Sequence, residues 1–250
     1  MTEAHGQAAY AVRFDWGSTG AAAIGTGADI AVVVDVLSFT TTLSVAAERG
    51  VTVYPYRWRD NTAEAYAAER GAVLARGRSE RAGVSLSPAS VLAAEGLERL
   101  VLPSPNGSSI SFGLADSGLT VVGACLRNRT AVARWLAPRL EAGSRVAVVA
   151  AGERWPDGSL RPAVEDLWGA GAVLAGLADL GAIGLSPEAE QAAAAFTAAE
   201  PGLADRLAAS ASGRELGAIG FADDDVRVAG ELDASGVVPV LEGDAFVAVA

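Results

Sequence analysis

Two short apolar runs constrain the fold of this chain more than any other feature of its sequence. Ile30–Val34 reads IAVVV and Arg145–Ala150 reads RVAVVA, and neither run alternates with polar residues. An unbroken β-branched run is typical of a parallel strand that is buried on both faces. Segments with helical patterns separate the predicted strands, and this alternation predicts helices packed on both faces of a sheet.

We therefore predict an α/β protein with three α/β/α layers and a mainly parallel or mixed sheet. The chain has 250 residues, which is enough for one large α/β domain or for two closely packed α/β lobes. We treat residues 1–250 as a single α/β domain, with a possible boundary between two lobes near residue 117.

The net charge limits the kinds of molecule that the chain can bind, and the cysteine content indicates its cellular compartment. The formal net charge is −11. An acidic surface disfavours binding to nucleic acids and anionic membranes, because both bind to basic surfaces. An anionic ligand must therefore be bound by a local arginine or a metal ion. Cys125 is the only cysteine, and no apolar run approaches ~18 residues, so we expect a cytoplasmic protein without disulfides. The sequence is compatible with a homodimer.

Polar side chains follow the first buried run, where ligands of parallel sheets usually bind. Asp35 ends that run, and Ser38, Thr41 and Thr42 stand where the next helix begins. Hydroxyl groups and free backbone N–H groups at a helix start form a natural anion site. The alternative is an ordinary helix N-terminus capped by a hydroxyl group. A haloacid dehalogenase site is excluded because Leu37 stands where that family has its second aspartate.

Two further segments carry groups suited to anion binding. In Pro105–Ser108 the Asn-Gly pair permits a tight turn whose amides can face a phosphate, although an ordinary turn has the same pattern. Gly123–Asn128 offers Cys125, Arg127 and an amide. A cysteine-dependent phosphatase needs arginine six positions after the cysteine, and residue 131 is alanine, so we expect Cys125 to be a packed thiol. Arg127 can still bind an anion through two nitrogens.

Acidic residues dominate the last third of the chain. Glu165 and Asp166 open an otherwise apolar helix, where they either stabilise the helix dipole or supply oxygen ligands to a hard cation. Asp223–Asp225 is a second acidic cluster that also fits a solvated helix cap. The single histidine, His5, lies near the N-terminus, so histidine-based catalysis and zinc sites are disfavoured.

The order of these motifs resembles the 2-phosphosulfolactate phosphatase family. The matching segments are Val32–Thr42, Pro105–Ser108, Gly123–Asn128, Ala151–Ala172, Gly220–Val226 and Val237–Pro239. The resemblance implies a magnesium-dependent phosphatase with a three-layer α/β/α fold that acts on a small, highly anionic sulfonate ester. The chain differs from the family at Ser38, where the family usually has arginine, and in a rewritten segment over residues 76–88.

Together these features predict a magnesium-dependent phosphatase for a small anionic phosphate monoester. Asp35, Glu165 and Asp166 are expected to act in catalysis and to hold Mg²⁺ with help from Asp225. The alternative is a non-catalytic paralogue that binds a small anionic phosphorylated metabolite. The expected substrate ligands are Ser38, Thr41, Thr42, Asn106, Gly107, Ser108, Arg127, Asn128 and Arg154.

Overall fold

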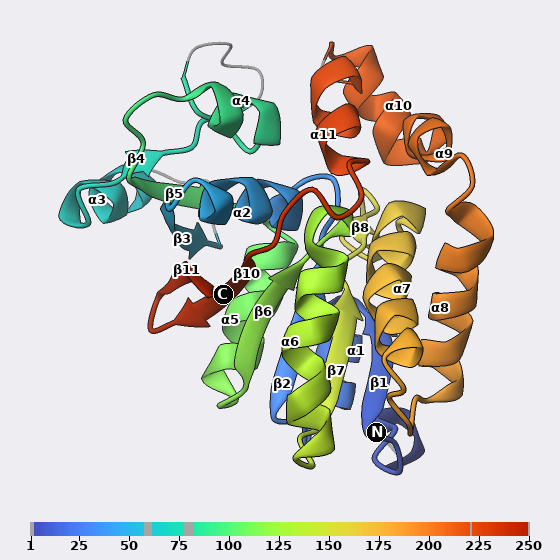
Figure 1. Cartoon of the computed structure of the whole chain (residues 1–250). Helices are drawn as coiled ribbons and strands as arrows, with labels where there is room; N and C mark the ends of the chain where they lie inside the picture. The colour runs from blue at the N-terminus through green and yellow to red at the C-terminus, as the bar shows by residue number, and fades with distance from the viewer. Residues whose placement is uncertain (1–2, 58–61, 78–82, 221, 250) are drawn as a thin grey trace.

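One mixed sheet runs through the whole molecule (Figure 1). The computed structural model describes residues 3–57, 62–77, 83–220 and 222–249. Within these ranges nine strands pair in the order β1-β7-β2-β6-β10-β11-β3-β5-β4, and a two-stranded hairpin, β8–β9, stands apart. The strands are β1 Val12–Trp16, β2 Ile30–Val34, β3 Thr52–Tyr56, β4 Val73–Leu74, β5 Arg99–Pro103, β6 Thr120–Ala124, β7 Val146–Ala150, β8 Glu153–Arg154, β9 Leu160–Arg161, β10 Val238–Glu242 and β11 Ala245–Val249.

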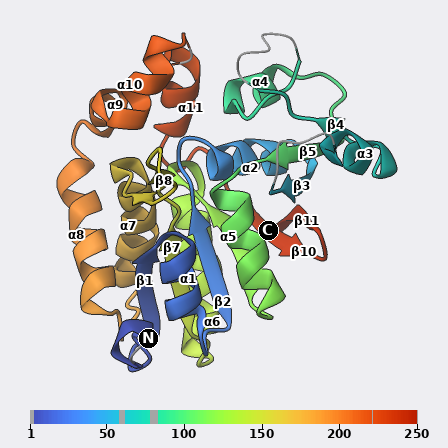
Figure 2. The ribbon, with the colours of Figure 1, turned by 180° about the vertical axis from the view of Figure 1, so that it is seen from behind.

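Helices cover both faces of the sheet, as predicted. Helices α6, α7 and α8 lie on the face that is in front in Figure 1, and α1 and α5 lie on the opposite face, in front in Figure 2. The α-helices are α1 Gly17–Gly25, α2 Phe39–Glu48, α3 Thr62–Glu69, α4 Pro88–Ala93, α5 Gly107–Asp116, α6 Arg129–Glu141, α7 Val164–Asp179, α8 Pro187–Ala199, α9 Leu203–Ala209, α10 Ala211–Ala218 and α11 Arg227–Ala229. Short 3₁₀ turns span Glu3–Gly6 and Leu126–Asn128, and a π-helical turn spans Ala222–Val226.

The first apolar run explains why the core has two layers. Successive side chains of a strand point to opposite faces. Ile30, Val32 and Val34 accordingly belong to the cluster under α6–α8, whereas Ala31 and Val33 belong to the cluster under α1, α2 and α5. All five side chains are buried, which confirms the prediction of a strand buried on both faces.

The C-terminal hairpin joins two parallel halves of the sheet. Strands β1, β7, β2 and β6 pair in parallel, and so do β3, β5 and β4. Strand β10 pairs antiparallel with β6, and β11 pairs antiparallel with β3. Residue 117 lies between α5 and β6. Strands from both sides of this residue share one sheet, and the division into lobes stays a prediction.

A side chain closes the free edge of β1, which is the first strand of the sheet order. The Gln7 amide nitrogen donates to the carbonyl oxygen of Phe14 at 2.8 Å, and the Phe14 N–H donates to the Gln7 amide oxygen at 3.1 Å. Gln7 therefore replaces a neighbouring strand at this point, because exposed strand edges otherwise invite pairing with another chain.

Residues 12–25 and 152–162 show neither an unbroken β-branched run nor a clear helical pattern in the sequence. The structure forms β1 and α1 in the first segment and the β8–β9 hairpin in the second. Strand β1 carries Arg13 and Asp15, so its polar residues weaken the apolar pattern of a strand. Among the described residues, no helix has both the length and the hydropathy required to span a membrane.

Two glycines in helices test the close packing of α7 against α8. A Cβ atom on Gly171 would lie 2.1 Å from the Ala192 carbonyl oxygen, whereas a Cβ atom on Gly113 in α5 would meet no atom within 4 Å. We expect Gly171→Ala to lower the free energy of unfolding by about 1–3 kcal/mol, because the two helices must separate. Gly113→Ala is the matched control and should raise it by up to ~1 kcal/mol through helix propensity. Equal effects of the two changes in urea unfolding would contradict this account of the α7–α8 contact.

Candidate functional site

Four carboxylates meet where the loops after β2 and β7 approach the start of α7. They belong to Asp35, Glu153, Glu165 and Asp166, and electrostatic interactions connect them. The carboxyl ends of parallel strands meet at one edge of a sheet, which explains why residues so distant in sequence are neighbours. We call these four residues the carboxylate cluster.

Asp35 ties the start of α2 to the start of α5. Its Oδ1 accepts a hydrogen bond from the Phe39 N–H at 3.2 Å, and its Oδ2 accepts one from the Gly107 N–H at 3.1 Å. A Cβ atom on Gly107 would lie 2.2 Å from the Phe39 ring and 2.8 Å from Asp35 Oδ2. Glycine is therefore required at this position of the predicted Asn-Gly turn, where it lets the backbone approach the carboxylate.

Asp166 joins the ends of β2 and β7. Its Oδ1 accepts from the Val36 N–H at 2.7 Å, and its Oδ2 accepts from the Gly152 N–H at 2.9 Å. Burial is the largest cause that raises the pKa of Asp166 well above its ordinary value, and the charges of Asp35 and Glu165 raise it further. The two backbone bonds favour the charged form but do not outweigh these effects.

Glu165 stands beside Asp166 in the first turn of α7 and is 2% exposed. Among the described residues, no hydrogen bond to its carboxylate is found, and the group lies within electrostatic reach of Glu153 and Asp166. A buried carboxylate without a bonding partner is costly unless a cation or a proton neutralises it. Glu165 is therefore the member of the carboxylate cluster whose oxygens are most available to a ligand.

Glu153 is the fourth member and was not among the predicted site residues. Desolvation, followed by the charge of Asp35, raises its pKa from 4.5 to about 7, although Arg161 and a hydrogen bond from Asn106 lower it. The side chain thus changes charge near neutral pH. Glu153 follows β7 after Ala151 and Gly152, whereas Asp35 follows β2 directly, and placement just beyond a buried strand is the signal that could have identified Glu153.

A small pocket opens beside the carboxylate cluster. Its volume is about 130 Å³, and it lies between the start of α1, the start of α5 and the β8–β9 hairpin. Asn106, Glu153 and Arg154 supply its polar wall, and Trp16, Ile110 and Leu160 supply apolar surface. Arg154 is exposed and brings a cation to this wall, so the pocket combines a positive group with nearby carboxylates.

Several predicted phosphate ligands are used inside the fold. The Thr41 hydroxyl donates to the Val36 carbonyl at 2.7 Å, and the Thr42 hydroxyl donates to the Leu86 carbonyl at 2.8 Å. The Ser108 hydroxyl donates to the Leu102 carbonyl at 3.4 Å. Ser38 is buried at the start of α2. The hydroxyl groups of Thr41, Thr42 and Ser108 thus bond to backbone carbonyls within the fold. Direct contact with a substrate stays a prediction for these three residues and for Ser38.

Arg127 and Asn128 have structural partners that the sequence analysis did not anticipate. The Arg127 guanidinium forms ion pairs with Glu48, at 3.0 Å, and with Glu231. The Asn128 amide accepts from the Cys125 N–H at 2.9 Å and donates to the carbonyls of Gly123 and Val237. These bonds connect β6 to α2 and to the C-terminal segment. Cys125 is fully buried, and burial raises the pKa of its thiol, in agreement with the prediction of a packed thiol.

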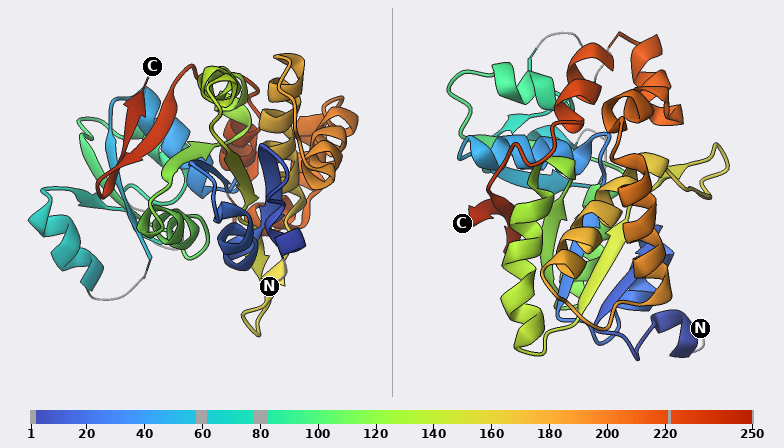
Figure 3. Two further views of the ribbon diagram at one scale, coloured as in Figure 1. Left: turned by 90° about the horizontal axis from the view of Figure 1, so that it is seen from below. Right: turned by 45° about the vertical axis from the view of Figure 1, so that its right-hand side comes forward.

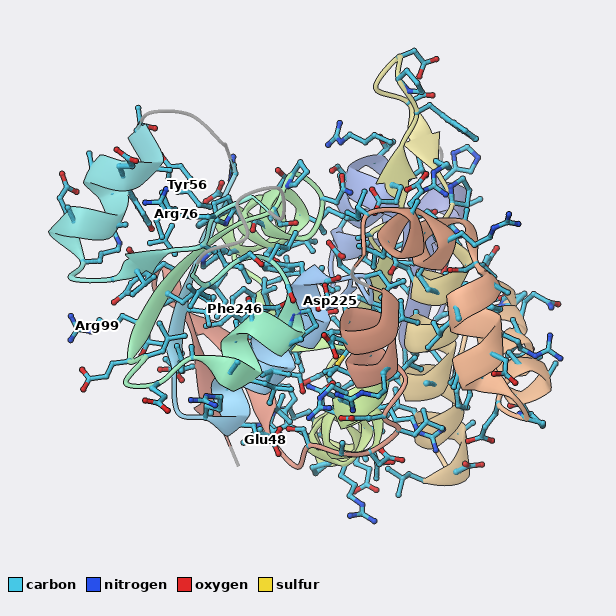
Figure 4. The ribbon with its side chains drawn as sticks, turned by 90° about the horizontal axis from the view of Figure 1, so that it is seen from above. Glu48, Tyr56, Arg76, Arg99, Asp225 and Phe246 are labelled. Carbon is cyan, nitrogen blue, oxygen red and sulfur yellow. The ribbon has the colours of Figure 1, made fainter. Side chains whose placement is uncertain are left out.

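Asp225 lies above the sheet, near the centre of the view in Figure 4. Its carboxylate accepts hydrogen bonds from the Ser87 hydroxyl and, at 3.4 Å, from the Ala89 N–H, so it ties the C-terminal segment to the start of α4. The described contacts give it a role in holding α4, and its predicted help in metal binding stays a prediction.

The raised pKa of Glu153 predicts how stability changes with pH. A carboxyl group whose pKa is higher in the folded state than in the unfolded state stabilises the fold at low pH, and this contribution disappears as the pH rises through the folded pKa. Between pH 5 and pH 8 the unmodified chain should therefore lose stability relative to Glu153→Gln. Thermal unfolding without divalent cations measures this difference, and Glu98→Gln at an exposed site is the control. A pH-independent difference between the unmodified chain and Glu153→Gln would show that burial does not hold the proton on Glu153.

A comparison with known protein families gives a match that covers most of the chain. The family model described as 2-phosphosulpholactate phosphatase matches residues 22–244, which is most of the chain. The match includes the four members of the carboxylate cluster and the Asn-Gly turn at the start of α5. The chain belongs to the 2-phosphosulpholactate phosphatase family.

Proposed function

We propose that this chain is a magnesium-dependent phosphatase that hydrolyses a small anionic phosphate monoester. The observation that carries the proposal is the carboxylate cluster, in which burial and the neighbouring carboxylates raise the pKa of Glu153 and of Asp166, beside a pocket that also contains an arginine. Repulsion between buried carboxylates is relieved by binding a cation. Membership of a phosphatase family supports the reaction class.

Glu165, Asp35 and Asp166 are the residues that would hold the metal ion. The described residues contain no preformed group of three His, Cys, Asp or Glu side chains spaced to hold a metal. Mg²⁺ does not need such a group, because it usually keeps several waters and binds one or two carboxylates together with substrate phosphate oxygens. Although Asp35 and Asp166 bond to backbone N–H groups, each carboxylate oxygen has a second lone pair. Bound Mg²⁺ would neutralise phosphate charge and orient the attacking water.

The protein's own residues account for binding and proton transfer. Arg154 lines the pocket and would bind an anionic group of the substrate. The first turn of α5 begins at Gly107, whose own N–H donates to Asp35, and the backbone N–H groups that follow it would bind a phosphate oxygen. Glu153 has a pKa of about 7, so it can donate a proton from Oε1 to the leaving alkoxide near neutral pH.

Metal binding can be tested at Glu165, the member of the carboxylate cluster for which no hydrogen bond is found among the described residues. Glu165→Gln keeps the shape of the side chain and breaks no hydrogen bond found among the described residues. We expect it to weaken Mg²⁺ binding at least about ten-fold in calorimetric titration, since one charged oxygen ligand is lost. Its melting temperature without Mg²⁺ should not fall. Glu190→Gln, in the first turn of neighbouring α8 and exposed, is the matched control.

Turnover should depend on the same ion. Excess chelator should abolish phosphate release, and Asp35→Asn should lower kcat by about 10²–10³-fold, as is typical when one electrostatic contributor to the transition state is removed. Full turnover in chelator would contradict the metal requirement. Binding of Mg²⁺ and phosphate without turnover of any ester tested would instead favour the non-catalytic paralogue.

The substrate preference follows from Ser38. This side chain is 1% exposed and stands where the family usually has arginine. A hydroxyl group supplies one neutral hydrogen bond, about half as strong as a charge-assisted one. Arg76, Arg78 or Arg81 could supply another cation; Arg76 is exposed, and residues 78–82 lie outside the described residues. We expect a screen of small phosphorylated acids to give a higher kcat/KM for esters without a sulfonate than for phosphosulfolactate. The opposite order would show that another cation replaces the missing arginine.

A further inference from the structure

The β8–β9 hairpin covers one side of the pocket and reaches out from the body of the protein (Figure 3). Its base is anchored by the Gly152 N–H, which donates to Asp166 Oδ2 at 2.9 Å. The Leu160 side chain packs into the space left by two glycines, 3.1 Å from a Cβ atom built on Gly17 and 2.7 Å from one built on Gly152. The position of the hairpin therefore decides the shape of the pocket.

Asn106 connects this hairpin to α5. It occupies the N-cap position of the helix, where asparagine ordinarily accepts a hydrogen bond from the first turn, yet its side chain makes no cap hydrogen bond. Its Nδ2 instead donates to Glu153 Oε2 at 2.9 Å, and its Oδ1 accepts from Arg154 Nε at 3.2 Å. A carboxamide has a donor at one end and an acceptor at the other, so it can satisfy a carboxylate and a guanidinium at once.

The bond to Asn106 leaves the outer part of Arg154 available. Within the described residues, the terminal guanidinium nitrogens of Arg154 form no ion pair, in contrast to Arg127, which pairs with Glu48 and Glu231. Asn106 is neutral, so it orients Arg154 without cancelling the charge of the guanidinium, as a carboxylate would.

We propose that Asn106 is a positioning residue that fixes Glu153 and Arg154 of the β8–β9 hairpin, so that Arg154 faces the non-reacting anionic group of the substrate. The kinetic consequence of this inference rests on the proposed phosphatase function. Its structural consequence rests on the two hydrogen bonds that Asn106 makes with Glu153 and Arg154. It changes the expected role of Asn106 from contact with the phosphate to orientation of the residues that make contact.

Limited proteolysis tests the structural consequence without requiring activity. Trypsin can cleave the hairpin after Arg154, whereas the bond after Arg161 is resistant because Pro162 follows. We expect Asn106→Ala to release the fragment ending at Arg154 several-fold faster than the unmodified chain. Ser117→Ala, at the other end of α5, is the control. Equal rates for the unmodified chain and Asn106→Ala would overturn the proposal.

A double variant that exchanges the hydrogen-bond donor and acceptor between residues 106 and 153 tests the Asn106–Glu153 bond directly. Asn106→Asp places two carboxylates against each other and should open the hairpin as Asn106→Ala does. Adding Glu153→Gln restores a donor opposite an acceptor and should return cleavage to the slow rate. A general loss of packing at position 106 would not be rescued in this way, so absence of rescue would overturn the role of the Asn106–Glu153 bond.

Kinetics separate positioning from direct contact with phosphate. If Asn106 acts through Arg154, Asn106→Ala should raise KM for an anionic ester about ten-fold, the value of one charge-assisted contact. The kcat should fall as well, because the same change frees Glu153, the proposed proton donor. In an Arg154→Ala background Asn106→Ala should have little further effect on KM, because residues that act through one another are not additive. A full additional effect would assign Asn106 to the phosphate instead. If the unmodified protein shows no turnover, the proposed function fails, and proteolysis still decides the role of Asn106.

Discussion

The Asp166 carboxylate is the interaction on which the site depends. It accepts one hydrogen bond from the loop after β2 and another from the loop after β7, so a single buried side chain aligns two neighbouring strands and the start of α7. Unpaired backbone N–H groups are costly when buried, and Asp166 satisfies two of them. The same geometry forces Asp35, Glu153 and Glu165 into its neighbourhood, so the bond that organises the loops also concentrates the negative charge.

The strands with unbroken apolar runs could be predicted from the sequence, because burial on both faces leaves no room for polar side chains. This held for β2 and β7, whose residues are all buried. Strand β1 could not be predicted in the same way. Arg13 is fully buried within it and bonds to the carbonyls of Ile24 and Thr26, contacts that depend on the tertiary structure.

The site was partly predictable for a related reason. Asp35, Glu165 and Asp166 stand at strand and helix ends, where the topology alone brings them together. The partners of Arg127 were not predictable, because Glu48 and Glu231 come from segments 79 and 104 residues away in the chain. Asn106 shows a similar limit. Its sequence context indicates an N-cap, but its amide bonds to the hairpin that follows β7. A local sequence pattern cannot predict a hydrogen bond to a segment so far away in the chain.

The C-terminal hairpin has a consequence for the order in which the protein can fold. Strands β10 and β11 lie in the middle of the sheet, between β6 and β3, although they come last among its strands. During synthesis, both parallel halves emerge from the ribosome before the hairpin that joins them. Each half then exposes one unpaired edge until residues 238–249 arrive, and such edges are the surfaces at which unfinished chains pair with each other. The strands that are synthesised last thus close the centre of the sheet rather than its rim.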